Sequence, residues 1–270
     1  MGAGQAGRHS GATAEAMGGL GTGYEQGRRR IVELVAGLDD HTAATPVPAC
    51  PEWSVHDVVA HLVGACADIM AGNVAGAATD PWTAAQVDAR KQRSFGEILA
   101  EWDDVGPQVA AFADDFPGRL GSQFIADVTV HEHDLRGALG RAGARDSDGV
   151  RIGADFLVNV FLHPGVTSLG LGPLETRAGE RTWVVGTGDP PTGDIGEASR
   201  AALMSTEVIP EPTGSPDGTL DVDEFELFRA LTGRRSAAQI RRFDWSVDAD
   251  PYLPVFGLGP FTIRSEDLVE

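Results

Sequence analysis

Hydrophobic residues recur at helical spacing through most of the first half of the chain. One amphipathic stretch begins at Tyr24 and places its apolar residues on a single face. A second stretch, residues 54–70, carries a continuous apolar stripe, and Ser54 and Asp57 have the spacing of a capping box at its start. Both segments are predicted to be helices that bury one face.

Two further helical regions follow. The third starts near Trp82, begins again at Ser94 with a second capping-box pattern, and runs as far as Pro107. Because proline lacks a backbone donor, Pro107 is expected to disturb the helix there. The fourth runs from about Arg119 and stops at Gly140. Four helices joined by linkers predict a four-helix bundle.

The sequence divides into three parts. Residues 1–23 are small and rich in glycine, without periodicity, and are expected to form a disordered leader. Residues 24–141 carry the four predicted helices. After a polar linker, residues 150–270 alternate short strand-like runs, turns and helices. The predicted fold class is therefore α+β, with an N-terminal helical bundle followed by a small α+β C-terminal domain.

Charge and cysteine content limit the function. The chain has 21 Lys and Arg against 40 Asp and Glu, a formal net charge of -19. This argues against nucleic acid or an anionic membrane as partner, since both require basic surface. The two cysteines, Cys50 and Cys66, do not form a CxxC pair. No apolar run is long enough to span a bilayer and the first residues lack the apolar core of a secretory signal, so a cytoplasmic protein is expected. The oligomeric state is not predicted.

The fourth predicted helix contains an unusual polar stretch, DVTVHEHDLR, which starts at Asp127. At about 100° per residue, Asp127, His131 and Asp134 fall on or beside the apolar side. His133 points nearly the opposite way, and Glu132 and His133 are predicted to lie on a solvated face. Asp127 and His131 are four residues apart, so their side chains can converge on one point.

Two interpretations of this pair remain open on spacing alone. A core-facing carboxylate is costly unless it is paired or binds a cation, so Asp127 and His131 could hold a metal. They could equally form an ordinary helical pair at a half-exposed boundary. His61 lies on the flank of the apolar stripe of the second helix, where periodicity predicts a surface histidine. Two histidines and one carboxylate would leave a coordination position open, as in catalytic sites.

Several motifs resemble a known family. PVPACPEWSVHDVVAHLVG followed by DVTVHEHDLRGALG is similar to the paired signatures of the mycothiol-dependent maleylpyruvate isomerase family, within the DinB-like metal-binding four-helix bundles. FELFRALTGRRSAAQI and LPVFGLGPF resemble the C-terminal half of many members. The resemblance spans roughly residues 24–268.

The resemblance implies a divalent metal, usually zinc, held by His61, Asp127 and His131. In the family the carboxylate ligand is a glutamate, whereas Asp127 is shorter by one methylene. The shorter side chain would shift the metal or weaken its binding. Asp134 is implied to support the site by fixing the orientation of a ligand.

The resemblance also implies an enzyme. Arg234, ahead of the adjacent Arg235, is the candidate for an arginine that holds the substrate carboxylate. The implied partners are a small electrophile and a low-molecular-weight thiol, mycothiol, and the implied reaction is isomerisation or conjugation. Two alternatives remain: a zinc-dependent hydrolase that activates water, and a non-catalytic metal-binding or interaction protein. Thiol-dependent turnover would separate the first possibility from the others.

Overall fold

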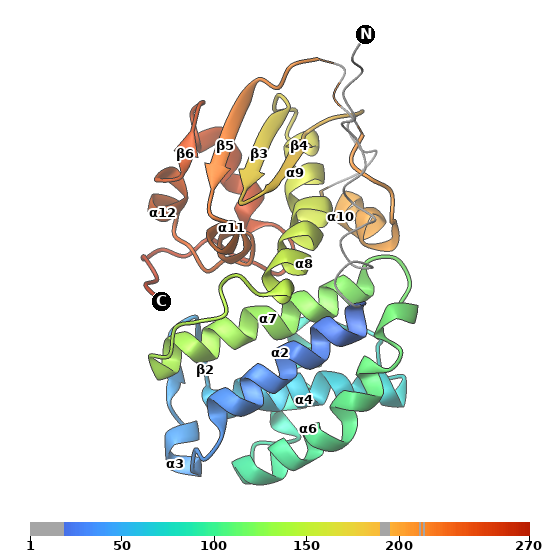
Figure 1. Ribbon diagram of the computed structural model, residues 1–270, viewed down its shortest axis with the longest axis vertical. Helices are drawn as coiled ribbons and strands as arrows, with labels where there is room; N and C mark the ends of the chain where they lie inside the picture. Colours follow the sequence, from blue (N-terminus) through green and yellow to red (C-terminus); the bar gives the residue numbers. More distant parts are fainter. Residues whose placement is uncertain (1–18, 190–194, 211, 213) are drawn as a thin grey trace.

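The N-terminal half of the chain is a helical bundle. The computed structural model describes residues 19–189, 195–210, 212 and 214–270. The elements of the first half are α2 (Leu20–Val35), α3 (Asp40–Ala43), β1 (Pro46–Val47), β2 (Cys50–Ser54), α4 (Val55–Ala71), α5 (Asp80–Asp88), α6 (Phe95–Ala110), the short η1 (Ala113–Asp115) and α7 (Leu120–Leu139). The four long helices α2, α4, α6 and α7 pack together (Figure 1). The expected four-helix bundle is confirmed.

The capping signals in the sequence set three helix ends as expected. The side chain of Ser54 accepts from the backbone N–H of Asp57 and that of Ser94 from the backbone N–H of Glu97, and both capping boxes are complete. α7 ends before Gly140, whose φ of 62° is left-handed. These interactions satisfy backbone groups that a helix end would otherwise leave without partners.

Two boundaries differ from the prediction. α2 begins at Leu20, four residues before the expected start, and residues 1–18 of the expected leader lie outside the described residues. α6 continues through Pro107 to Ala110. The last turn of α6 places Val109 in the core of the bundle, where it is fully buried, and this burial offsets the backbone hydrogen bond that proline cannot make.

The C-terminal half contains a four-stranded sheet with helices beside it, so the α+β class is confirmed. Its described elements are α8 (Asp148–Leu157), the π-helical η2 (Val158–Leu162), α9 (His163–Ser168), β3 (Leu174–Ala178), β4 (Arg181–Val185), α10 (Ile195–Met204), β5 (Gly218–Val222), α11 (Glu224–Leu231), α12 (Ala237–Arg241), β6 (Asp244–Trp245) and η3 (Asp250–Gly257). The strand order is β4-β3-β5-β6, and only the β3–β5 pair is parallel. Among the helices described here, none is both long and apolar enough to cross a membrane.

α7 belongs to two hydrophobic cores. Ile125 and Val128 pack in the core of the bundle. Ala126 and Val130, on another face of the same helix, pack in the core of the C-terminal half. Figure 1 shows α7 between α2 on one side and α8 on the other. The division of the chain at residues 141–150 into two domains stays a prediction, because one helix contributes to both cores.

The prediction of a solvated face on α7 was wrong. Glu132 is fully buried and His133 is 3% exposed. The side chain of Glu132 accepts hydrogen bonds from Arg30 at 2.8 Å and from Arg136 at 2.9 Å. The ring of His133 packs against Phe225 of α11, with 4.7 Å between centroids. The face looked solvated because helical periodicity cannot reveal a second core on the far side of the helix.

Substitution of Glu132 by glutamine tests this correction. We expect Glu132→Gln to lower the free energy of unfolding by about 1–3 kcal/mol, because an uncharged amide would turn a donor toward a guanidinium. Urea unfolding measures this change. Glu180→Gln, at an exposed position, should change it by less than about 0.5 kcal/mol. Equal effects of the two substitutions would contradict the buried placement of Glu132.

Candidate metal centre

Three side chains converge between α4 and α7. The Nε2 atom of His61 lies 3.4 Å from Oδ2 of Asp127, and the Nε2 atom of His131 lies 3.7 Å from Oδ1 of the same carboxylate. One ligand atom from each residue lies within 4.8 Å of the others. The structure therefore brings together the three residues predicted from the sequence, and their role as metal ligands stays a prediction.

His61 is buried, although periodicity predicted a surface position. It is 5% exposed, because α5 covers the flank of α4. Gly64, one turn further along α4, permits this close packing, since a Cβ there would lie 2.4 Å from Cβ of Gln86. The absence of a side chain at Gly64 thus allows Gln86 to reach the imidazole of His61.

Hydrogen bonds on the far sides of the two imidazoles orient both rings. Nδ1 of His61 lies 2.8 Å from Oε1 of Gln86, and Nδ1 of His131 lies 3.0 Å from Oδ2 of Asp134. The amide of Gln86 is itself oriented, because its nitrogen donates to Asp68 at 2.8 Å. Both acceptors are oxygens, so each Nδ1 carries the proton and each Nε2 presents its lone pair toward Asp127.

The charges in the centre favour a bound cation. Burial raises the pKa of Asp127, but His61 and His131 outweigh this effect and bring the pKa below its usual value of 3.8. Burial lowers the pKa of His61, yet the charge of Asp127 and hydrogen bonds to Asp127 and Gln86 raise it above 6.5. The ionised carboxylate of Asp127 is a negative charge that a metal ion would neutralise, and the metal would compete with a proton for Nε2 of His61.

The donor set fits a divalent metal. Two imidazole nitrogens and one carboxylate form the three-ligand pattern of catalytic zinc sites, in which another position takes water or substrate. The side chain of Asp127 is 34% exposed, so the centre can be reached from solvent on that side. Trp53 packs against both imidazoles, with ring centroids 5.3 Å from His61 and 5.8 Å from His131.

A second group of possible ligands, Cys50, His131 and Asp134, also lies close together. Burial, followed by the charge of Asp134, raises the pKa of Cys50 to about 12. A thiol must lose its proton to bind a metal, and the adjacent carboxylate of Asp134 disfavours a thiolate at Cys50. The carboxylate of Asp134 is already bound by two arginines. The group with His61 and Asp127 is therefore the better centre.

Asp134 lies where a supporting residue is needed. Its side chain is fully buried, and its oxygens accept from Nη2 of Arg229 and from Nη2 of Arg234, each at 2.7 Å, as well as from His131. Burial raises the pKa of Asp134, but Arg234 and Arg229 lower it well below its usual value. The supporting role is consistent with this geometry and stays a prediction.

Arg234 faces Asp134 from the turn after α11. Gly233, at a φ of 72°, makes this turn, because a side chain there would clash with the backbone of Thr262. The guanidinium of Arg234 donates to Asp134, to the carbonyl of Thr232 at 2.7 Å and to the sulfur of Cys50 at 3.3 Å. Its predicted role of holding a substrate carboxylate would have to share these donors, and that role stays a prediction.

The adjacent Arg235 points to a different partner. Its Nε donates to Glu226 at 2.6 Å.

Two residues that orient the imidazoles were not predicted from the sequence. Gln86 orients His61 directly, and Arg229 acts on His131 through Asp134. A charged residue inside the apolar segment FELFRAL was the only signal for Arg229.

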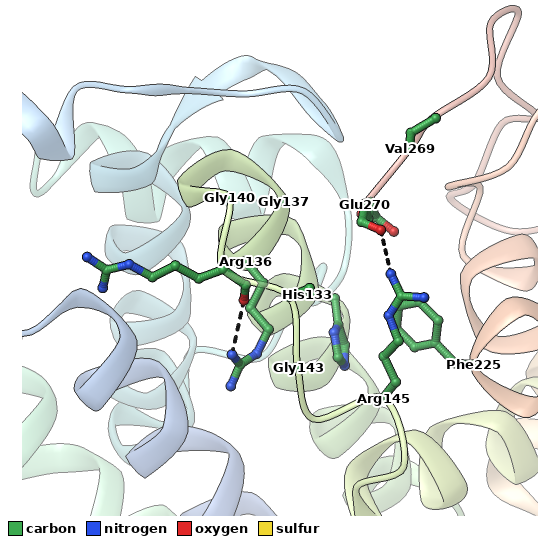
Figure 2. A pocket seen from close by; sticks show the side chains of 11 residues that line it. His133, Arg136, Gly137, Gly140, Gly143, Arg145, Phe225, Val269 and Glu270 are labelled. Atoms are coloured by element: carbon green, nitrogen blue, oxygen red, sulfur yellow. Dashed lines mark hydrogen bonds between the residues drawn. The ribbon is translucent and has the colours of Figure 1, made fainter.

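A cleft of about 230 Å³ lies beside a different face of α7. Figure 2 shows His133, Arg145, Phe225 and Glu270 around it. Burial, followed by the charges of Arg229 and Arg136, lowers the pKa of His133 to about 2, so this histidine is neutral at physiological pH. His133 packs against Phe225 on the cleft side of α7 and is not in the group formed by His61, Asp127 and His131.

Part of the chain matches a known protein family. Residues 24–136 match the family model described as the mycothiol maleylpyruvate isomerase N-terminal domain. The matched segment contains the three candidate ligands and Asp134, and it ends before Arg229 and Arg234. No curated protein and no solved structure matches the chain.

Proposed function

Since residues 24–136 belong to the family of mycothiol maleylpyruvate isomerase N-terminal domains, we propose that the protein is a metal-dependent enzyme that uses mycothiol to isomerise or conjugate a small electrophile. His61, Asp127 and His131 hold the metal, zinc or another divalent ion. The observation that carries this proposal is the convergence of two oriented imidazoles on one ionised carboxylate, with Nε2 lone pairs facing inward.

The residues around the centre support thiol chemistry. A divalent metal bound there would lower the pKa of a thiol at an open coordination position, so that a nucleophile forms near neutral pH. Gln86 and Asp134 keep the Nδ1 protons of the two imidazoles in place. Trp53 covers the imidazoles and limits the access of water from its side.

We infer that the thiol comes from outside the protein. Without a metal, burial raises the pKa of Cys50 to about 12 and that of Cys66 to about 11, so neither cysteine is a thiolate at neutral pH by itself. The sulfur of Cys66 also lies 2.9 Å from the hydroxyl of Tyr24 in the bundle core. These are the two cysteines of the chain, so a low-molecular-weight thiol would supply the nucleophile.

Turnover that depends on both metal and thiol is the expected result. The protein should act on an unsaturated carboxylic acid such as maleylpyruvate when zinc and mycothiol are both present, and lose activity when either is removed. Product formation is followed by chromatography on metal-free and zinc-loaded protein, with and without mycothiol. Cys50→Ser should retain thiol-dependent turnover, because Cys50 is not the nucleophile. Zinc-dependent turnover without any thiol would contradict the proposal, and a hydrolysis product would identify the alternative in which the metal activates water.

A further inference from the structure

A network of buried charges connects His131 to Glu270. The carboxylate of Asp134, which accepts from His131, is bound on its other oxygen by Nη2 of Arg229 at 2.7 Å. Nε of Arg229 donates to Oε2 of Glu270 at 2.9 Å, and Nη2 contacts the other oxygen of that carboxylate. Two residues, Arg229 and Asp134, therefore separate Glu270 from His131.

Arg229 is fully buried, and its position leaves it little freedom. Its side chain has no exposed surface, and Nη1 donates to the carbonyl of Val130 at 3.1 Å, one residue before His131. A buried guanidinium requires anionic partners. Arg229 has two of them, and its charge is shared between Asp134 and Glu270.

Glu270 is held in place by a second arginine. Nη1 of Arg235 donates to Oε2 of Glu270 at 3.1 Å, and Nε of Arg235 donates to Glu226 at 2.6 Å. The side chain of Glu270 is 7% exposed. Figure 2 shows Glu270 at the wall of the cleft, next to Arg145. Glu226 belongs to the same network through its hydrogen bonds with Arg235, and among the described residues it has no hydrogen bond with Arg229.

The charge on Glu270 affects the imidazole of His131 through Asp134. If Glu270 loses its charge, Arg229 interacts more strongly with Asp134, and Asp134 becomes a weaker acceptor for the Nδ1 proton of His131. A weaker acceptor fixes the orientation of the His131 ring less firmly, and an imidazole that is held less firmly binds a metal less tightly. The loss of one buried negative charge acts in the same direction on a bound cation.

We propose that Arg229 and Glu270 are positioning residues for the metal centre and that the charge of Glu270 tunes the affinity of the centre for its metal. This proposal rests on the proposed function, because it requires His131 to be a ligand. It adds to that function a control from the C-terminal half, outside the segment that matches the family.

The test compares two substitutions that remove the same charge. Glu270→Gln should weaken zinc binding about tenfold, the lower end of the range for partners of metal ligands. Glu226→Gln removes an equal charge from the same network at a residue that is hydrogen-bonded to Arg235 instead of Arg229, and the zinc affinity of this variant should remain close to that of the wild type. Zinc affinity is measured on the whole 270-residue chain by competition with a chromophoric chelator. The visible absorption of the cobalt-loaded protein should shift in Glu270→Gln and not in Glu226→Gln.

Each outcome of this test either supports the proposed role of Glu270 or overturns it. Equal affinities and equal cobalt spectra for Glu270→Gln and the wild type would overturn the proposal while the proposed function stands. Equal weakening in both variants would also overturn it, because the effect would then be one of net charge alone. If Glu270→Gln does not fold, Arg229→Lys gives the same decision, since a lysine cannot hold both carboxylates and should also weaken zinc binding. A wild-type protein that binds neither zinc nor cobalt would remove the proposed function and this proposal together.

Discussion

His131→Ala is expected to purify as a folded protein without metal, whereas the wild type carries about one zinc ion per chain. The substitution removes one of three side chains that converge within 4.8 Å, and two remaining ligands do not retain zinc through purification. His61→Ala should lose the metal for the same reason. Elemental mass spectrometry on protein purified without chelator measures the zinc content, and circular dichroism reports whether each variant is folded.

A histidine outside the centre provides the matched control. His41 is exposed on the short helix α3, so His41→Ala should retain the zinc content of the wild type. Zinc retained by both His61→Ala and His131→Ala would place the metal elsewhere. A wild-type protein that stays free of metal when zinc is supplied would remove the basis for the proposed enzyme.

Asp134→Asn is expected to lower the free energy of unfolding of the metal-free protein by about 3–5 kcal/mol, the range for breaking a buried ion pair. Arg234 loses the one carboxylate to which it is paired, and Arg229 keeps only Glu270. The asparagine amide would also turn its own donor toward a guanidinium or toward His131. Urea unfolding in the presence of a chelator measures the change without a contribution from bound metal.

This loss should depend on pH. The pKa of Asp134 in the folded protein lies well below the usual value, which is about 3.9 in an unfolded chain. A carboxylate with a lowered pKa stabilises the fold at neutral pH, and that contribution disappears as the pH falls below about 4 and toward the folded pKa. The difference between Asp134→Asn and the wild type should therefore be full at pH 7 and shrink in acid.

An exposed carboxylate serves as the control for Asp134. Asp221 is paired with Arg177 on the sheet and its side chain is 42% exposed, so Asp221→Asn should cost less than about 1 kcal/mol. A similar cost for both substitutions, or a cost for Asp134→Asn that does not change with pH, would mean that the ion pairs of Asp134 contribute little to stability.

Much of the fold could be predicted from the sequence because its signals are local. The two capping boxes at Ser54 and Ser94 and the glycine after α7 act within one helical turn, and the structure contains all three. Burial was harder to predict, since it depends on what packs against a helix. Glu132 and His61 were expected near solvent and are both buried, because Arg30 of α2 binds Glu132 and α5 covers the flank of α4 that carries His61.

The candidate centre was predictable only in part. The spacing of Asp127 and His131 indicates that their side chains converge on one point beside the same helix. The resemblance to a family added His61 to this pair. The groups that orient the imidazoles come from positions far away in the chain. Gln86 lies 25 residues after His61, and Arg229 lies 95 residues after Asp134. Such pairs depend on how separate elements pack, and no local pattern encodes them.

Because α7 packs in two cores, the protein can tolerate only some substitutions and domain replacements. A metal-binding bundle with an entirely polar outer surface could be joined to any partner domain by gene fusion. Here Ala126 and Val130 of α7 lie in the core of the C-terminal half, and Glu132 and His133 are buried on the same helix as the candidate ligands. A chimera that replaces the C-terminal half must therefore supply a surface that complements α7. The two halves are expected to be inherited together, with substitutions on one side compensated on the other.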